Sequence, residues 1–224
     1  MAAYAYGFSA ATKLTFQSDS DLSVTNDTSG VVLAWMKSGT VRVCRYKEDG
    51  AGSPVDTGLS TSHAPSITKY ADALYLFWVT SSQKVQYTIL DPVTLRATRI
   101  ETVPIMATKS GVATAIFKGK LILLHIGKTS GIAGRTIYQM SYDLETNSWS
   151  SQDSSVSGNQ SSKDGPAMAA AGDLLFMAHR GQTDGAGGNT IYYSTNSGGQ
   201  PGQWSNNKQI ASARAQTRPG AGAI

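Results

Sequence analysis

The chain of 224 residues is poor in cysteine, in charged residues and in long apolar runs. Its one cysteine, Cys44, cannot form an internal disulfide, so the fold does not depend on an oxidising compartment. Only 15% of the residues are charged, and no segment shows helical periodicity, which argues against a helical protein. No apolar run reaches the roughly 18 residues that a membrane-spanning helix needs. No signal peptide is visible at the start, which leaves a cytoplasmic location or export by a non-classical route open.

The basic residues are not clustered in the way that is typical of nucleic-acid-binding proteins. The net charge is +4, but the lysines and arginines are scattered, and no DNA- or RNA-binding motif is present. The histidines lack nearby partner ligands, and no catalytic triad order or phosphate-binding loop occurs. We therefore expect no nucleic-acid partner, no metal site and no cofactor.

What the chain does contain is an internal repeat. Four strings align: "LSVTNDTSGVVLAW" from Leu22, "PSITKYADALYLFW" from Pro65, "VATAIFKGKLILLH" from Val112 and "PAMAAAGDLLFMAH" from Pro166. Each reads as a strand of small residues, a turn and a bulkier, apolar strand. Third strands follow at 41–46, 85–90, 137–142 and 191–195, and a fifth copy begins with "RPGAGAI" at the C-terminal end. The aligned positions are 43 to 54 residues apart, by subtraction along the sequence.

This period, with several short strands per unit, predicts an all-β protein of the β-propeller type. A β-sandwich also has many short strands, but it does not predict in-phase repetition. We predict a single domain, 1–224, of five blades. Its parts are N-terminal closing strands at 1–18, repeats at about 20–62, 63–107, 108–161 and 162–216, and a partial repeat at 217–224. The last blade is composite, with an inner strand at 221–223. It lacks a second strand, so a three-stranded blade and completion by a neighbouring chain both stay open.

Two turns after third strands carry a further pattern. Ser141, Asp143 and Trp149 match Ser-x-Asp-x-Gly-x-x-Trp with one extra residue, and Ser194, Asn196, Gly198 and Trp204 match it with a longer insertion. The first two copies do not match. The pattern resembles the Asp-box of sialidase-like and lectin-type β-propellers, where it is a structural device. The resemblance implies that Asp143 accepts N–H bonds in its own turn and that Trp149 is mostly buried.

The resemblance does not extend to catalysis. The Phe/Tyr-Arg-Ile-Pro motif of sialidases is missing, and the inner strands offer only Asp21, with Asp164 just outside one. We therefore expect a lectin-like propeller that binds a glycan or glycoprotein at shallow sites repeated around one face, and we consider an enzyme the weaker reading. The alternatives are a degenerate sialidase-like glycoside hydrolase or lyase, and a protein-interaction or toxin-associated scaffold. The oligomeric state stays open.

Propeller topology places the ends of second strands and the loops before first strands on one face. Aromatic and planar polar side chains there are typical of a carbohydrate site. The predicted ligand-binding residues are His179, Arg180, Asp184, Lys163, Asp164, His125, Lys128, Arg135, Trp78 and Trp35, with the group from His179 to Asp184 at its centre. Blade packing is the alternative role for the two Trp and two His residues. An exposed ion pair between Arg180 and Asp184 is the alternative for those two.

Overall fold

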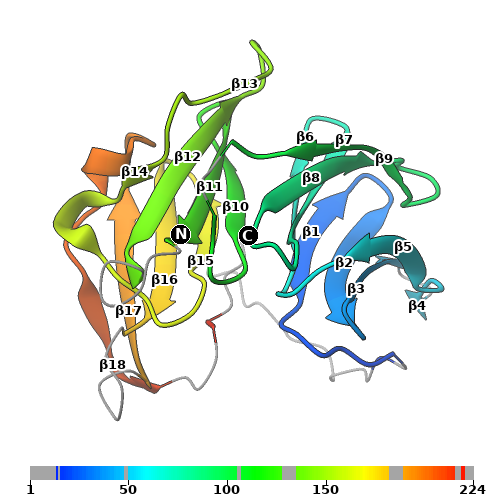
Figure 1. Ribbon diagram of the computed structural model, residues 1–224, viewed down its shortest axis with the longest axis horizontal. Helices are drawn as coiled ribbons and strands as arrows, with labels where there is room; N and C mark the ends of the chain where they lie inside the picture. Colours follow the sequence, from blue (N-terminus) through cyan, green and yellow to red (C-terminus); the bar gives the residue numbers. More distant parts are fainter. Residues whose placement is uncertain are drawn as a thin grey trace, which may run out of the picture.

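The computed structural model describes residues 14, 16–47, 50–104, 107–127, 135–181, 189–214 and 218–219. These residues form four antiparallel sheets, as Figure 1 shows. Within these ranges there is no α-helix, and hence no helix long and apolar enough to cross a membrane. The chain is an all-β protein with a propeller arrangement of four blades.

The strands run outwards from the centre in chain order within each blade. The first blade contains β1 (Ser23–Asp27), β2 (Gly30–Lys37), β3 (Thr40–Lys47), β4 (Gly50–Ala51) and β5 (Val55–Ser60). The second contains β6 (Ser66–Tyr70), β7 (Ala73–Val79), β8 (Val85–Leu90) and β9 (Ala97–Thr102). The third contains β10 (Ala113–Phe117), β11 (Lys120–Ile126), β12 (Ile137–Asp143), β13 (Ser148–Trp149) and β14 (Ser154–Ser155). The fourth contains β15 (Ala167–Ala171), β16 (Leu174–Arg180), β17 (Thr190–Asn196) and β18 (Lys208–Arg214).

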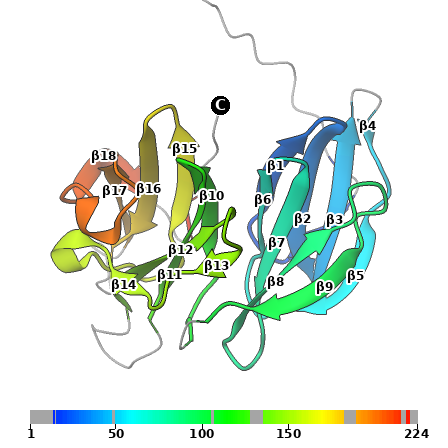
Figure 2. The same cartoon turned by 90° about the horizontal axis from the view of Figure 1, so that it is seen from above.

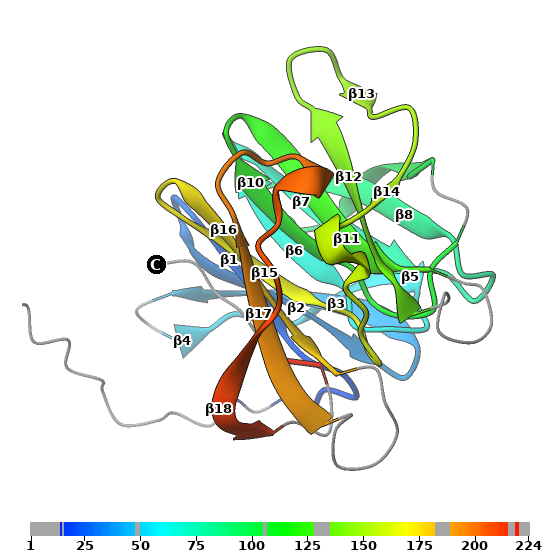
Figure 3. The same ribbon diagram turned by 90° about the vertical axis from the view of Figure 1, so that its left-hand side faces the viewer.

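The inner strands β1, β6, β10 and β15 pack side by side in that order. Figure 2 shows these four strands in the middle of the molecule, with β4, β5 and β9 further out on one side and β14, β17 and β18 on the other. Figure 3 shows the fourth blade from its outer side, with β17 and β18 nearest the viewer. Small side chains dominate these inner strands, which allows the backbones to approach one central axis.

The second strands hold the blades together. Leu76 and Trp78 of β7 pack against the first blade, whereas Phe77 of the same strand packs against the third. In the third blade, Leu123 of β11 faces the second blade and Leu124 faces the fourth. A strand buried on both faces must be apolar at successive positions, which explains the continuous apolar runs of the repeat. Burying each such side chain contributes about 1.5–3 kcal/mol.

The prediction of five blades is wrong, because the structure has four. The segments assigned to a composite fifth blade, 1–18 and 217–224, form no strand in the part of them that is described. Phe16 instead stacks on Trp35 with ring centroids 4.4 Å apart, and Leu14 packs on the same face of the first blade beside Cys44. This segment covers the free blade face with side chains and forms no additional sheet. The predicted inner strand at 221–223 lies outside the described residues.

An aspartate or asparagine caps the turn after three of the third strands. Asp143 Oδ1 accepts the N–H groups of Glu145 (3.0 Å) and Thr146 (3.1 Å). Asn196 Oδ1 accepts those of Gly198 and Gly199, and Asp91 Oδ1 those of Val93 and Thr94. The predicted bonds of Asp143 are therefore present, with Trp149 half-buried and Trp204 buried. Because Asp91 makes the same turn without the Asp-box pattern, these turns do not identify an Asp-box or a sialidase-like protein.

Candidate functional site

The loops before the inner strands share one conformation. Three of them contain a hydroxyl that donates to the carbonyl two residues later: Ser18 to Ser20 (2.7 Å), Thr61 to His63 (2.8 Å) and Thr108 to Ser110 (3.0 Å). The next backbone N–H donates to a carbonyl at the end of the second strand of the same blade; the donors are Asp19, Ser62, Lys109 and Lys163. Local turns of this kind hold each loop on the same face of the propeller, at the start of its inner strand.

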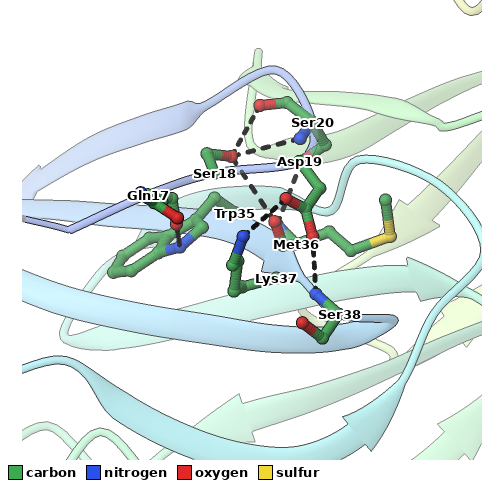
Figure 4. A network of polar contacts seen from close by, with 8 residues as sticks. All are labelled: Gln17, Ser18, Asp19, Ser20, Trp35, Met36, Lys37 and Ser38. Atoms are coloured by element: carbon green, nitrogen blue, oxygen red, sulfur yellow. Dashed lines mark hydrogen bonds and ion pairs between the residues drawn. The ribbon is translucent and has the colours of Figure 1, made fainter.

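Figure 4 shows this arrangement in the first blade. The carboxylate of Asp19 accepts hydrogen bonds from Lys37 Nζ (2.8 Å) and from the N–H of Ser38 (2.7 Å). The hydrogen bond from Lys37, and next the one from Ser38, lowers the pKa of Asp19. Trp35 Nε1 donates to the carbonyl of Gln17 at 3.0 Å. The chain is therefore fixed on both sides before it enters the inner strand.

Two glycines let the loops pack closely around the axis. A Cβ atom on Gly165 would lie 2.4 Å from the carbonyl oxygen of Gly111. A Cβ on Gly111 would lie 2.9 Å from the carbonyl oxygen of Ala64 and 3.1 Å from Nη1 of Arg218. Because these distances are below normal contact, a residue with a side chain would push the loops apart.

The same loops surround two cavities. The axial cavity, of about 300 Å³, is lined by residues of all four inner strands together with Arg218 and Pro219. The mouth cavity, of about 280 Å³, is lined by the preceding loops. Asp21, Ala64 and Arg218 line both cavities, so the two are adjacent, and we call them together the axial path.

The mouth cavity carries most of the charge of the site. Its basic side chains come from Lys109, Lys163 and Arg218, and its carboxylates from Asp21 and Asp164. Burial lowers the pKa of Arg218, and the charge of Asp21 acts in the opposite direction. Arginine nevertheless stays protonated in proteins.

Two neighbouring groups modify this charge. Burial lowers the pKa of His63 below its usual 6.5, so its ring is neutral at pH 7. Arg180, at the end of β16, forms an ion pair with Asp164 (2.8 Å between Nη2 and Oδ2) and is only 5% exposed. The charge of Asp164 is therefore balanced from behind the cavity wall.

Four of the predicted ligand-binding side chains are buried at the ends of second strands. Trp35, Trp78, His125 and His179 are each 1% exposed. His125 Nε2 lies 3.0 Å from Asp153 Oδ2, and its ring stacks on Tyr138.

His179 repeats this pattern in the fourth blade. Its Nε2 lies 2.9 Å from Asn207 Oδ1, and its ring stacks on Tyr192. Burial lowers the pKa of His179. The two histidines therefore fill equivalent packing positions in neighbouring blades.

The structure brings some of the other predicted residues together. Lys163, Asp164 and Arg180 converge at the mouth cavity or directly behind it. Arg135 lies before β12, where its carbonyl accepts the N–H of Ser162, and it does not line either cavity. Lys128 and Asp184 lie outside the described residues.

Four ionisable cavity residues were absent from the predicted site, namely Asp21, His63, Lys109 and Arg218. A signal for two of them, Asp21 and Arg218, exists in the repeat. The residue just before each aligned position is Asp21, Ala64, Gly111, Gly165 or Arg218, and all five line the mouth cavity. Within the described ranges, no group of three His, Cys, Asp or Glu side chains is placed to hold a metal ion.

No protein-family model matches the chain, and no curated protein sequence matches it either. Solved structures do resemble it. GH43B of a Bacteroides ovatus xyloglucan PUL has a TM-score of 0.61 at 13% identity over 89% of this chain and 42% of its own. An endo-arabinase from Bacteroides thetaiotaomicron has a TM-score of 0.61 at 16% identity, covering 88% of this chain and 82% of that one.

A lectin of Aleuria aurantia, solved with Fucalpha1-6GlcNAc, has a TM-score of 0.59 at 12% identity over 91% of this chain and 66% of its own. The chain spans less than half the length of the first of these three proteins. At such low identity the likeness shows the propeller fold and nothing finer.

Proposed function

We propose that this chain is a carbohydrate-binding β-propeller whose binding site is the path formed by the axial and mouth cavities. The main observation in support of this proposal is that loops and inner strands from all four blades line this path. A concave site with a few convergent polar groups is the usual form of a small-ligand site. The folds that resemble this one include a lectin solved with a bound sugar and an arabinase, which agrees with the proposal.

The proposal differs from the predicted set of repeated shallow sites. Such sites would use the side chains at the ends of the second strands, and Trp35, Trp78, His125 and His179 are 1% exposed. The described residues that line the two cavities include no Phe, Tyr or Trp. Recognition at the axis would therefore rely on hydrogen bonds and charge more than on aromatic stacking.

The test is a glycan array probed with the full chain and with a variant that fills the path. Ala64 lines both cavities, so Ala64→Gln places a longer side chain in the path. Ala211→Gln is the matched control, because Ala211 is exposed on the outer strand β18. We expect the wild-type chain and the control to bind the same glycans and Ala64→Gln to bind none of them. Equal binding by both variants would place the sugar elsewhere, and no glycan binding by the wild type would refute the proposal.

A glycoside hydrolase is the second candidate, because Asp21 and Asp164 line the same mouth cavity. Hydrolysis needs two carboxyl groups about 5–9 Å apart on either side of the scissile bond. If the chain is an enzyme, incubation with the glycans that it binds releases new reducing ends, and Asp21→Asn abolishes this release. Binding without release of reducing ends would favour the lectin.

A further inference from the structure

Arg218 is the unusual residue of the site. Its half-buried side chain lines both cavities, and its Nη1 lies beside Gly111, in space that a side chain at that position would crowd. Arg218 makes no hydrogen bond and no ion pair within 4.0 Å with any residue of the described ranges; Asp21 acts on it only at longer range. A guanidinium group has five N–H donors in a planar fork. Among the described residues no acceptor pairs with these donors, and the side chain lines the two cavities.

The charge around Arg218 is positive in sum. Lys109 is half-buried on the wall of the mouth cavity, and Lys163 lies on the exposed rim. The carboxylate of Asp164 is balanced by Arg180, which leaves Asp21 as the remaining negative group. Arg218 and Lys109 therefore face one carboxylate, Asp21, that has no ion-pair partner within 4.0 Å among the described residues.

An anionic group on the ligand would fit this arrangement. An arginine fork matches the two oxygens of a carboxylate, or two oxygens of a sulfate, with parallel hydrogen bonds. A concave site whose net charge is positive also raises the local concentration of anionic ligands. Neutral sugars would leave the donors of Arg218 to water.

We propose that the axial path binds the carboxylate or sulfate group of an acidic glycan, with Arg218 as the bidentate donor and Lys109 as the second cation. This inference rests on the proposed function, since it assigns a ligand class to the same site. Asp21 then sets the selectivity: its negative charge beside Arg218 weakens anion binding, and its removal strengthens it.

The experiment begins with an array that carries neutral, uronate-containing and sulfated oligosaccharides. Calorimetry then compares the acidic oligosaccharide that binds most tightly with its carboxyl-reduced or desulfated counterpart, which separates the two sources of negative charge. We expect the acidic form to bind at least about tenfold more tightly than the neutral form. We also expect this preference to fall between 50 and 500 mM salt, because exposed charges are screened at the higher concentration.

The variants assign the preference to named residues. Arg218→Ala should abolish it and Arg218→Lys should keep part of it, because lysine retains the charge but not the fork. Asp21→Asn should increase affinity for the acidic form several-fold. Arg99→Ala is the matched control: its side chain is 84% exposed on β9 and pairs with Glu101, so the acidic preference should not change. If Arg218→Ala does not fold, Lys109→Gln tests the same point, with an expected loss of at least about threefold in the preference.

The outcomes separate the two proposals. Equal affinity for acidic and neutral forms, or a preference that survives both Arg218→Ala and Lys109→Gln, would overturn the acidic-glycan inference and leave carbohydrate binding standing. Failure to bind any glycan would overturn the proposed function itself.

Discussion

The turn after β17 offers a direct test of how much one side chain stabilises a blade. Asn196 is 1% exposed, and its Oδ1 accepts the N–H groups of Gly198 (2.9 Å) and Gly199 (2.7 Å). Its Nδ2 donates to the carbonyl of Gln200 at 2.7 Å. Asn196→Ala removes all three hydrogen bonds, and two of the backbone partners, Gly198 and Gly199, are half-buried. At about 1 kcal/mol for each bond, we expect the free energy of unfolding to fall by about 3 kcal/mol.

The equivalent turn of the third blade provides the comparison. Asp143 makes two such bonds, and both of its partners are exposed, so water replaces the lost bonds. Its contact with Lys120 (3.3 Å) is a surface ion pair and contributes little. Asp143→Ala should therefore cost only about 1 kcal/mol. Burial, and not the presence of the motif, decides the difference between the two turns.

Urea denaturation followed by tryptophan fluorescence measures both values. For a chain of this size, 3 kcal/mol corresponds to a decrease in Tm of about 6–12 °C, and 1 kcal/mol to about 2–4 °C. Asn26→Ala, at an exposed position of β1, is the control and should change stability by less than about 0.5 kcal/mol. The reasoning is refuted if Asn196→Ala and Asp143→Ala have the same cost.

Three further predictions concern the loops and the end of β16. Gly165→Ala should destabilise the protein by about 1–3 kcal/mol, because its Cβ would meet a carbonyl oxygen at 2.4 Å; Gly202→Ala, with open space around it, should be neutral in the same denaturation assay. His179 has a pKa lowered by burial, so its stabilising contribution is complete above pH 6.5 and is lost as the pH falls below that value towards its folded-state pKa; His179→Gln should flatten the stability profile between pH 7 and 5. Arg180→Ala should lower Tm, because it leaves Asp164 without its buried partner; an unchanged Tm would contradict this view.

The repeat pattern was sufficient to predict the sheets. Small residues before a turn and bulky residues after it predicted the hairpins β1–β2, β6–β7, β10–β11 and β15–β16 in the correct chain order. It could not predict the number of blades. The pattern at the two ends of the chain reads equally well as strands or as an extended segment that contributes side chains only. The stacking of Phe16 on Trp35 is an example of a segment that contributes side chains only. Backbone pairing depends on neighbouring chain segments, which a local pattern does not describe.

The candidate site was harder to predict than the fold, because the large and reactive side chains of the repeat are not the residues that line the cavities. The Trp and His residues at the ends of the second strands were predicted to bind the ligand, because these side chains are large and chemically versatile. In the structure Trp78 is buried between the first and second blades, and His125 is buried in the third blade beside Asp153 and Tyr138. The cavity residues, by contrast, are mostly small or flexible. Gly111 and Gly165 carry no reactive side chain, and only the close packing of the loops shows why glycine is needed there.

One position of the repeat supplies a residue of the mouth cavity in every copy. The residue before the aligned position lines the mouth cavity in all five copies, and three copies place Ala64, Gly111 or Gly165 there. These small residues open the path, while Asp21 and Arg218 place opposite charges in it. The close contacts of Gly111 and Gly165 exclude side chains in those two copies, whereas Asp21 and Arg218 already carry side chains at the equivalent position. Exchanging the two charges, with Asp21→Arg and Arg218→Asp in one chain, should then leave the blades intact and reposition the positive charge at the axis. A folded double variant with unchanged ligand affinity would show that the axis does not select the ligand.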